Sequence, residues 1–274
     1  MSGDYLDTAE WLHLAEQLER GGKAMHPHTC GGGNKLLVEN ADAGFKAWCY
    51  RCSIGGLKSH PQPSLSERIA ALRVQRQADE AVEADPRPPL PANFDPSTWP
   101  LEPRVWLYKC GLSNAIIKAN GFYWCDRIKR VVLPVLDGSK LCYWQARGFD
   151  KDRPKYLNPK IDKPAFKSGP LSSGPLVLTE DILSAVKVGQ VARAWSILGT
   201  ALSLSTASAV AALGVPVLIW LDPDEAGRKG RRRIAAQLRA MGVDVRIIRA
   251  EQDPKYFSKD QICEILTASN NGAS

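Results

Sequence analysis

Residues 217–233 read VLIWLDPDEAGRKGRRR. The apolar run 217–221 predicts a buried strand, and that strand ends in two carboxylates one residue apart, Asp222 and Asp224. Five basic residues and no acid follow within residues 228–233. The stretch therefore predicts a strand-to-helix junction that places acidic side chains directly beside a basic helix.

Strands and helices alternate on both sides of this junction. Apolar strand-like runs and helical segments follow one another from residue 175 to residue 250. Such alternation is typical of a mostly parallel sheet with helices on its faces. Ahead of it, RVVLPVLD (130–137) and KLCYWQARGFD (140–150) predict two paired strands joined by a DGS turn. We therefore expect an α/β protein.

Length and composition place the chain among globular proteins. It has 274 residues, 44% of them hydrophobic, and a formal net charge of +7, which excludes a disordered tail. No segment approaches the roughly 20 apolar residues that a transmembrane helix needs, and the N-terminal segment does not have the pattern of a signal peptide. We expect a cytoplasmic protein with no membrane association.

The N-terminal part of the chain predicts a small domain followed by a linker. Residues 5–20 predict an amphipathic helix, and short strand-like runs lie at 35–39 and 45–48. A polar helix with a capping box at Ser64–Glu67 comes next, and the proline-dense segment 85–100 predicts a linker or an extended wrap. The main body is expected from about residue 100, where residues 103–120 predict a helical segment.

Cysteine and histidine gather in one segment of the small domain. Cys49 and Cys52 form a CxxC pair, and Cys30 follows two histidines, His26 and His28. Two ligand pairs on glycine-rich turns, at opposite ends of a short ribbon, are typical of a structural tetrahedral Zn²⁺ site. We expect the three cysteines and one histidine to bind zinc; His28 is the closer in spacing, and His26 is the alternative. Free thiols and surface histidines are the competing interpretation.

Three expected strands of the main body end in acids. Glu180 and Asp181 follow the first, Asp222 and Asp224 the second, and Glu251 and Asp253 come shortly after the third. Functional groups gather where parallel strands end, and clustered carboxylates there favour a divalent cation such as Mg²⁺. Helix capping explains Asp224 but does not explain three acidic strand ends on one sheet. The sequence therefore predicts a cation site.

The stretch 217–230 and its neighbours resemble a known family. VLIWLDPDEAGRKG is similar to the DxD segment of the TOPRIM fold as it occurs in DNA primases. WSILGTALS (195–203) resembles the LGTALT segment of bacterial primases, and QDPKYF (252–257) resembles their following Asp-Pro motif. The zinc ribbon also occupies the N-terminal place that it has in these primases.

Segments upstream extend the resemblance to residues 24–56 and 103–257. RVVLPVLD, QARG, RPKYLNP and FKSG resemble the basic subdomain that precedes TOPRIM, and WLYKCGLSNAIIKANGF (106–122) resembles the helical segment that opens the primase core. The implied fold is α/β, with a small zinc ribbon, a basic α+β subdomain and a TOPRIM domain with a mostly parallel sheet. Its expected parts are a helix and zinc ribbon (1–58), a helix and proline-rich linker (59–100), the basic subdomain (101–173), TOPRIM (174–258) and a C-terminal tail (259–274).

The resemblance implies a DNA primase, a DNA-directed RNA polymerase that makes short RNA primers on single-stranded DNA from nucleoside triphosphates. Glu180, Asp222 and Asp224 would be the catalytic ligands of Mg²⁺ or Mn²⁺, with Asp253 as a further ligand. Two ions would lower the pKa of the primer 3′-hydroxyl and neutralise the leaving pyrophosphate. The chain has no GxxxxGK[ST] helicase loop, so we expect a phage, plasmid or mobile-element primosome with a separate replicative helicase.

Basic and aromatic residues inside the matched segments are the expected nucleotide and DNA contacts. Arginine suits a bidentate grip on phosphate, and aromatic rings stack on bases. In the ribbon, Lys46 and Trp48 would share one face of a strand, and Phe45 and Ala47 the other. The expected contacts are Arg130, Arg147, Lys155, Tyr156, Asn158, Lys167, Arg228, Lys229, Trp48 and Arg51.

The chain departs from the family pattern at the first acidic strand end. Ser184 stands four residues after Glu180, where TOPRIM proteins usually carry Asp, and Asp181 stands where they usually carry Gly. Asp181 or Asp253 would then compensate for the lost ligand. Two alternatives stay open: a degenerate primase-like module that binds single-stranded or origin DNA, and a TOPRIM nuclease or recombination mediator.

Overall fold

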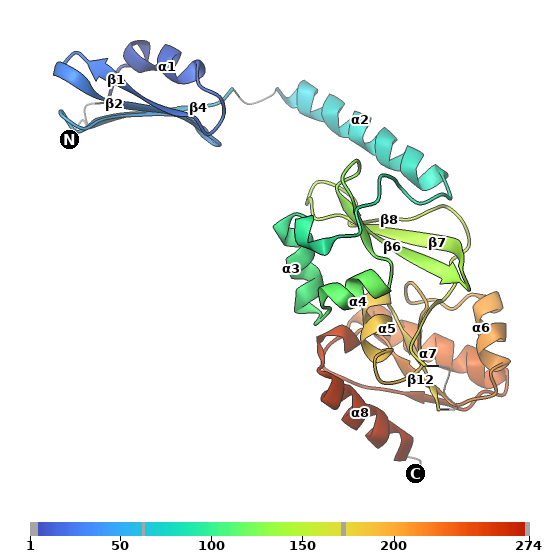
Figure 1. The fold of residues 1–274 in the computed structure, drawn as a ribbon. Coiled ribbons are helices and arrows are strands. Elements are labelled where there is room, and N and C mark those ends of the chain that lie inside the picture. The colour runs from blue at the N-terminus through green and yellow to red at the C-terminus, as the bar shows by residue number, and fades with distance from the viewer. Residues whose placement is uncertain (1–4, 62–63, 171–173, 272–274) are drawn as a thin grey trace. The chain divides into compact units, whose positions relative to one another are not determined.

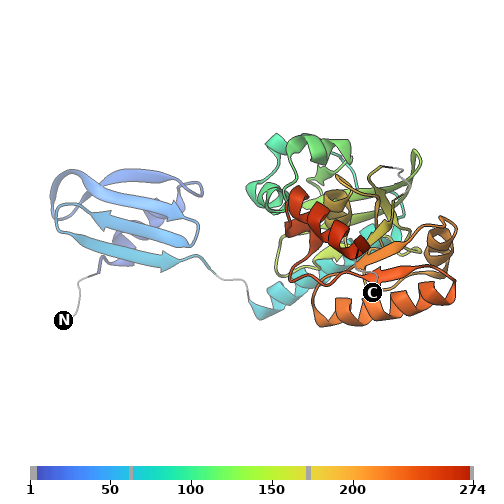
Figure 2. The same ribbon diagram turned by 90° about the horizontal axis from the view of Figure 1, so that it is seen from below.

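The chain divides into two units, Met1–Val74 and Gln75–Ser274, and the computed structural model describes residues 5–61, 64–170 and 174–271 (Figures 1 and 2). The boundary between the units lies within helix α2 (Leu65–Ala84), whereas the sequence predicts that the first domain ends near residue 58. Each unit has a hydrophobic core of its own.

A four-stranded antiparallel sheet and one helix, α1 (Thr8–Glu16), build the first unit. The sequence predicts strands only around the centres of β2 and β3, because the Gly, His and Pro residues of β1 and β4 give no clear apolar alternation. Helix α1 is shorter than the predicted 5–20, since Asp7 caps it by accepting a hydrogen bond from the Ala9 N–H at 3.0 Å. The strands, paired in chain order, are β1 (Lys23–His28), β2 (Gly31–Ala41), β3 (Gly44–Cys49) and β4 (Ile54–Ser59).

One face of this sheet packs on α1. Trp11 of α1 is fully buried in a cluster with Val38 and Ala47, and Gly56 of β4 makes room for it, since a Cβ there would lie 2.5 Å from the indole Nε1. Trp48, on the opposite face, is 42% exposed. The predicted division of β3 into a core face and a free face is therefore confirmed.

Helix α2 is tied to the second unit at its C-terminal end. Its N-terminus has the predicted capping box, in which Glu67 N–H donates to Ser64 Oγ at 3.2 Å and Ser64 N–H donates to Glu67 Oε2 at 2.7 Å. Asp79, 5% exposed, pairs with Arg153 at 2.6 Å. This ion pair holds the C-terminal end of α2 against the second unit.

The proline-dense segment 85–100 is an extended wrap rather than a free linker. Trp144 Nε1 donates to the Pro86 carbonyl at 3.1 Å, and the Tyr123 hydroxyl donates to the Pro89 carbonyl at 2.9 Å. Its only helical turn is η1 (Pro96–Thr98). Side chains of the second unit thus donate hydrogen bonds to backbone carbonyl groups of this segment.

The second unit opens with two short helices, α3 (Leu101–Lys109) and α4 (Asn114–Ala119). The sequence predicts one helical segment over 103–120. Gly111 interrupts it with a φ of +70°, a conformation that favours glycine and ends a helix. Ser113 then caps α4 by accepting a hydrogen bond from the Ile116 N–H at 3.4 Å.

Two sheets follow these helices. The first is antiparallel, in the order β5 (Tyr123–Cys125), β6 (Arg130–Asp137), β7 (Lys140–Arg147) and β8 (Tyr156–Leu157). The second has the order β13-β12-β10-β11-β9. Its elements are β9 (Phe166–Ser168), β10 (Leu176–Thr179), α5 (Ile182–Val188), β11 (Ala194–Ser196), α6 (Leu204–Ala211), β12 (Val217–Trp220), α7 (Glu225–Ala240) and β13 (Val245–Ile247).

The second sheet is parallel except at one edge, as predicted. Strands β11, β10, β12 and β13 are parallel neighbours, and β9 pairs antiparallel with β11. Residues 166–168, which the sequence assigns to the basic subdomain, thus form the edge strand of this sheet. The larger hydrophobic cluster contains residues of both sheets, so the two sheets form one body.

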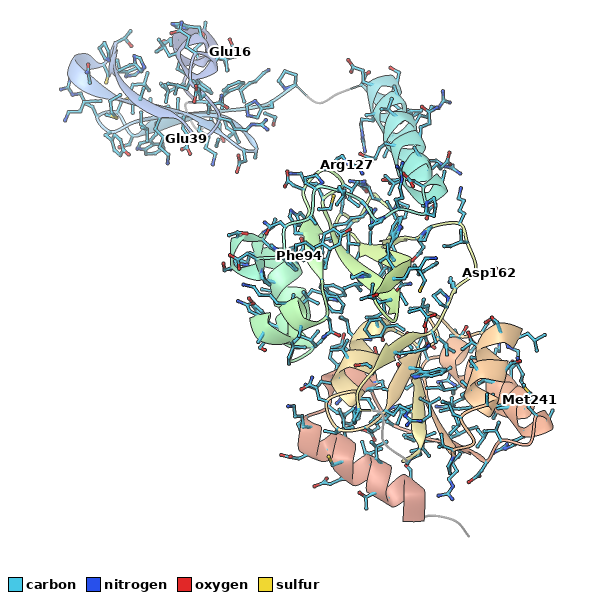
Figure 3. All side chains as sticks on the ribbon, turned by 45° about the vertical axis from the view of Figure 1, so that its right-hand side comes forward. Glu16, Glu39, Phe94, Arg127, Asp162 and Met241 are labelled. Atoms are coloured by element: carbon cyan, nitrogen blue, oxygen red, sulfur yellow. The ribbon has the colours of Figure 1, made fainter. Side chains whose placement is uncertain are left out.

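Both faces of the second sheet are covered. Leu218 and Trp220 lie in the larger hydrophobic cluster, which also contains residues of the antiparallel sheet, whereas Val217 and Ile219 face Ile234 of α7 in another cluster. Side chains fill the space between sheets and helices (Figure 3). Strands buried on both faces read as continuous apolar runs, which explains why VLIWL shows no alternation.

Residues 259–271, expected as part of a tail, form helix α8 (Lys259–Asn271). Ile262 is fully buried and Leu266 is 8% exposed in the cluster that covers one face of the parallel sheet. The apolar spacing of four residues gives α8 one buried side. None of the helices in the described part of the chain has the length and hydropathy that a membrane crossing requires.

Candidate active site and nucleic-acid interface

The acidic strand ends meet at one edge of the parallel sheet. Strands β10 and β12 are parallel neighbours with Thr179 opposite Trp220, so Glu180 and Asp222 leave the sheet side by side. Asp253 comes after β13, the next strand in the sheet. The carboxyl ends of parallel strands share an edge, and the predicted acids follow that rule.

Asp222 and Glu180 carry carboxyl oxygens that are shielded from solvent and have no hydrogen-bond partner, namely Asp222 Oδ1 and Glu180 Oε2. Burial raises the pKa of Asp222 to about 7; Lys255 opposes the rise, and Asp181 adds to it. Burial, and then the charge of Asp224, also raise the pKa of Glu180. Unpartnered oxygens of this kind fit a hard cation such as Mg²⁺, which prefers oxygen ligands.

Asp224 both caps a helix and presents an exposed carboxylate. Its Oδ1 accepts a hydrogen bond from the Gly227 N–H at 2.7 Å, which starts α7. Gly227 lies so close to β12 that a Cβ would collide with the carbonyl oxygen of Asp222. The glycine of DPDEAG therefore allows the helix to begin directly against the strand that carries Asp222.

Lys255, which the sequence analysis did not select, lies among the acids. It belongs to η2 (Pro254–Tyr256), and its Nζ is 2.9 Å from Asp181 Oδ2, 2.5 Å from Asp253 Oδ2 and 4.0 Å from Asp222 Oδ2. Burial lowers the pKa of Lys255, but Asp181 and Asp253 outweigh burial and hold it above its ordinary value. Lys255 is therefore a charged ammonium with three carboxylate neighbours.

Asp181 and Ser184, the two departures from the family pattern, contact each other. Ser184 N–H donates to Asp181 Oδ1 at 3.1 Å, and Ser184 Oγ donates to Oδ2 at 2.8 Å. Asp181 thereby caps α5 while its Oδ2 also receives Lys255. Both carboxylate oxygens of Asp181 thus already accept hydrogen bonds within the protein, and its compensation for the missing ligand stays a prediction.

The basic start of α7 braces the loops around the DPDEAG segment. Arg228 Nη1 donates to the Pro223 carbonyl at 2.5 Å, and Arg233 Nη2 donates to the Thr200 carbonyl at 2.9 Å. Lys229 pairs with Glu225 at 2.6 Å on the exposed side of the helix. Exposed pairs are weak, so Lys229 can exchange Glu225 for a phosphate at little cost.

Arg147, at the end of β7, lies among three aromatic rings. Its Cζ is 5.6 Å from the ring centroid of Trp106, 5.5 Å from that of Phe149 and 5.3 Å from that of Tyr156, while its Nε and Nη1 have no partner. Burial raises the pKa of Tyr156 to about 12, with Asp181 adding to the rise and Arg147 opposing it. The guanidinium of Arg147 is therefore held among aromatic rings while two of its nitrogen atoms stay unpartnered.

Arg130, a predicted substrate contact, lies inside the protein. It is 1% exposed, and its Nη1 donates to the carbonyls of Ala146 at 3.3 Å and Lys155 at 3.4 Å. Gly148 leaves room for the guanidinium, because a Cβ there would collide with it. The sequence analysis selected Arg130 because it lies in a segment that resembles bacterial primases, and that resemblance gave no sign that the side chain is buried. Arg130 supports the loop that carries Lys155 and is not a surface contact.

The remaining nucleotide or DNA contacts that the sequence predicts in the basic subdomain (101–173) differ in their exposure to solvent. Lys155 is exposed, with its Nζ 6.0 Å from the ring centroid of Tyr156. Lys167 is also exposed and pairs with Asp137 at 3.2 Å. Asn158 is half-buried and its Oδ1 has no partner. Lys155 can thus reach a phosphate directly, whereas Lys167 would first have to leave Asp137.

The predicted zinc ligands form a cluster in the first unit. His28, Cys30, Cys49 and Cys52 offer ligand atoms that all lie within 4.8 Å of one another. Cys30 Sγ is 3.5 Å from Cys49 Sγ, and Cys52 Sγ is 3.6 Å from His28 Nδ1. The cluster contains His28 and not His26, so the fourth ligand position belongs to the histidine that is nearer to Cys30 in sequence. One histidine and three cysteines fit tetrahedral zinc.

Neighbouring groups orient one of these ligands, His28, and lower the pKa of another, Cys49. Glu10 Oε2 lies 3.3 Å from His28 Nε2, which leaves Nδ1 to face the cysteines, as in many histidine–zinc sites. Burial raises the pKa of Cys49, but the backbone N–H groups of Cys52 and Arg51 outweigh burial and lower it to about 6. A thiolate is the form that binds metal, so both contacts favour binding.

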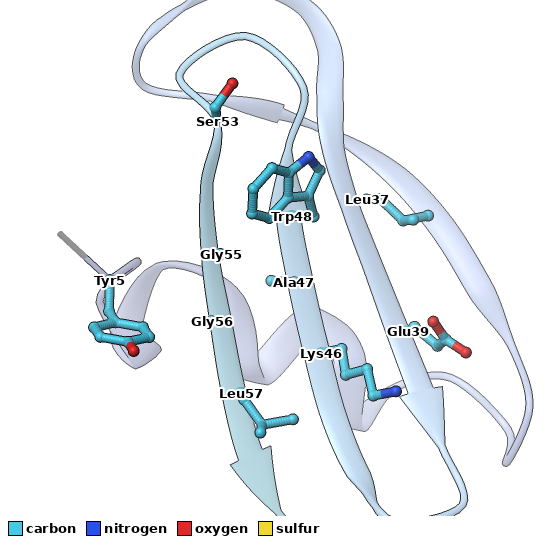
Figure 4. Close-up of a pocket in the computed structure, with 10 residues that line it drawn as sticks. All are labelled: Tyr5, Leu37, Glu39, Lys46, Ala47, Trp48, Ser53, Gly55, Gly56 and Leu57. Carbon is cyan, nitrogen blue, oxygen red and sulfur yellow. The ribbon is translucent and has the colours of Figure 1, made fainter. Parts of the chain in front are cut away.

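The free face of the ribbon sheet forms an apolar hollow (Figure 4). Trp48 lies over Gly55, where a Cβ would be 2.9 Å from the indole ring. Leu57, opposite Lys46 on the neighbouring strand, is 66% exposed. Tyr5, 82% exposed, and Lys46 also line the hollow. Arg51 lies apart from this hollow, against Gly31 near the zinc ligands. Glu39, opposite Lys46 on the neighbouring strand, also lines the hollow, which is therefore apolar and aromatic with one charge of each sign. Aromatic rings on such a surface suit stacking on unpaired bases.

Comparisons with known proteins agree with this architecture. Residues 179–258 match a family described as Toprim-like, and none of the curated proteins matches the chain in sequence. A DnaG catalytic core is 16% identical, with a TM-score of 0.52 over 72% of this chain and 79% of that one. The RNA polymerase domain of Mycobacterium tuberculosis primase DnaG is 15% identical, with a TM-score of 0.51 over 76% and 84%. The E. coli primase catalytic core is 17% identical, with a TM-score of 0.50 over 73% and 80%.

Proposed function

We propose that this chain, which has the fold of a primase catalytic core with a Toprim-like domain at 179–258, is a DNA primase that joins nucleoside triphosphates into short RNA on single-stranded DNA. The observation that carries the proposal is the acidic edge of the parallel sheet, where Asp222 Oδ1 and Glu180 Oε2 are buried without partners. Fold likeness alone does not identify a reaction, whereas clustered carboxylates with unpartnered oxygens at the end of a parallel sheet favour a bound divalent cation.

Glu180, Asp222 and Asp224 would hold Mg²⁺ or Mn²⁺. Bound there, the ion would lower the pKa of a 3′-hydroxyl and neutralise charge on the leaving pyrophosphate. Asp222 has a pKa of about 7, so it gives up its proton on binding a cation at neutral pH. The proposed activity therefore rises with pH through neutrality.

Arg147 and Lys155 are the proposed phosphate contacts beside this edge. The aromatic rings around Arg147 fix its guanidinium while its Nε and Nη1 stay unpartnered, and such a fork suits bidentate binding of a triphosphate. Lys155 is exposed near the same tyrosine ring and adds a point charge. Together they would orient the triphosphate toward the acidic edge.

The ribbon is the proposed template reader. Zn²⁺ held by His28 and the three cysteines would stabilise the unit, whose hydrophobic core is small. Trp48, on the free face of the sheet, would stack on an unpaired base, and Lys46 on the same face would meet the backbone. A separate helicase partner stays a prediction from the sequence.

Nucleotide incorporation tests the proposed function. Purified protein is incubated with random-sequence single-stranded DNA, four labelled ribonucleotides and Mg²⁺ or Mn²⁺, in parallel with Asp222→Ala. Asp260→Ala is the matched control, because Asp260 is an exposed acid in the first turn of α8. We expect short products from the wild type and the control and none from Asp222→Ala. Tight DNA binding without products would favour the binding-module alternative, and template cleavage would favour a nuclease.

A further inference from the structure

The acidic edge already contains one positive charge. Lys255 Nζ lies 2.9 Å from Asp181 and 2.5 Å from Asp253, and its side chain is only 12% exposed. Lysine side chains are rarely buried unless they form ion pairs with carboxylates. Lys255 therefore occupies a position among carboxylates at which a metal ion would otherwise find its ligands.

Asp222 divides the site into two halves. Its Oδ2 faces Lys255 at 4.0 Å, whereas its Oδ1 is shielded and has no partner. Glu180 Oε2 is likewise unpartnered. One half thus offers unpartnered oxygens to a cation, and in the other half the oxygens of Asp181 and Asp253 already receive the ammonium.

The backbone around Lys255 is well anchored. Pro254 is buried, and Phe257 packs against Trp220 of β12 with ring centroids 5.5 Å apart. Ser184 holds Asp181 with two hydrogen bonds. A second cation on the Asp181 side would have to expel a buried lysine from fixed partners, and otherwise it would meet a like charge.

We propose that Lys255 is a resident cation that takes the place of a second divalent ion, so that the acidic edge binds a single Mg²⁺. This inference rests on the proposed function and departs from the two-ion arrangement expected from the sequence. It also gives Ser184 a role: an aspartate at that position would add a charge beside Asp181, whereas serine donates hydrogen bonds to it.

The number of bound ions tests this inference directly. Zinc-loaded full-length protein is titrated with Mn²⁺ by calorimetry, and Mn²⁺ positions are located by anomalous diffraction from soaked crystals. We expect one Mn²⁺ at the acidic edge of the wild type and two in Lys255→Ala, which frees Asp181 and Asp253. Lys255→Arg keeps the charge and should bind one ion. Lys259→Ala, which removes an exposed lysine of α8, should also bind one.

Two Mn²⁺ ions at the edge of the wild-type protein would overturn the inference, and so would a folded Lys255→Ala with a single ion. Lys255→Met, which keeps the length of the side chain without its charge, serves if Lys255→Ala does not fold, and it should bind two. Primer synthesis is measured on the same samples. One bound ion without synthesis would refute the proposed function and support the ion count, whereas synthesis with two ions in the wild type would do the reverse.

Discussion

Asp222→Asn should stabilise the protein in the absence of added divalent cations. The pKa of Asp222 rises from 3.8 to about 7 on folding, chiefly through burial, so the ionised carboxylate opposes folding at neutral pH. One pKa unit corresponds to about 1.4 kcal/mol, which sets an upper limit of about 4 kcal/mol. The side chain keeps 21% exposure, and solvent screening reduces the expected gain to about 2 kcal/mol.

The sign of the pH dependence follows from the raised pKa. Protonated Asp222 favours the folded state, so the contribution of this group is complete below about pH 4 and is lost as the pH rises through 7. The advantage of Asp222→Asn should therefore be full near pH 8 and disappear toward pH 4. Urea denaturation at about pH 8, 6 and 4.5, followed by the transition of the second unit, measures the free energy of unfolding.

Addition of Mg²⁺ should reverse the ranking. The wild type should gain about 2.7 kcal/mol at a Mg²⁺ concentration of 100 times its dissociation constant, and Asp222→Asn should gain nothing. Asp224→Asn is the control without a predicted gain, because Asp224 is exposed and asparagine caps a helix equally well. An advantage of Asp222→Asn that is the same at all three pH values, or a loss of stability near pH 8, would refute the reasoning.

Three further predictions concern the ribbon and the start of α7. Cys49→Ser should release zinc and unfold the first unit, since zinc binding supplies folding free energy; a colorimetric zinc assay with circular dichroism measures both, and retained zinc would contradict it. Trp48→Ala should weaken single-stranded DNA binding by about 1–3 kcal/mol, the value of one stacked base, without unfolding the ribbon; fluorescence anisotropy measures this, and unchanged affinity would exclude the hollow as the template surface. Gly227→Ala should cost about 1–3 kcal/mol of stability, because the methyl group meets the Asp222 carbonyl; an unchanged urea midpoint would show that α7 can shift freely.

The sequence was sufficient for the features that depend on local pattern. The apolar run before Asp222 predicted a buried strand, and the edge rule of parallel sheets then brought Glu180 and Asp253 to the same place. The spacing of cysteines and histidines predicted the cluster in the ribbon, and the structure selected His28. These inferences succeed because periodicity and ligand spacing act over a few residues.

Features that depend on distant contacts were not predictable in this way. Lys255 pairs with Asp181, which is 74 residues earlier in the chain; the only signal was a lysine two residues after Asp253. Arg130 reads as one more basic residue of a matched segment, and only the packing around Gly148 shows that it is buried. Such placements depend on which helices, strands and loops contact one another in the folded chain, and local patterns in a single sequence do not predict these contacts.

Sequencing of the products made on a random single-stranded DNA library tests the central claim most directly. The account predicts short ribonucleotide products that are complementary to their templates and are lost in Asp222→Ala. Products without complementarity, or no products with either Mg²⁺ or Mn²⁺, would contradict the assignment of a template-directed primase to this chain.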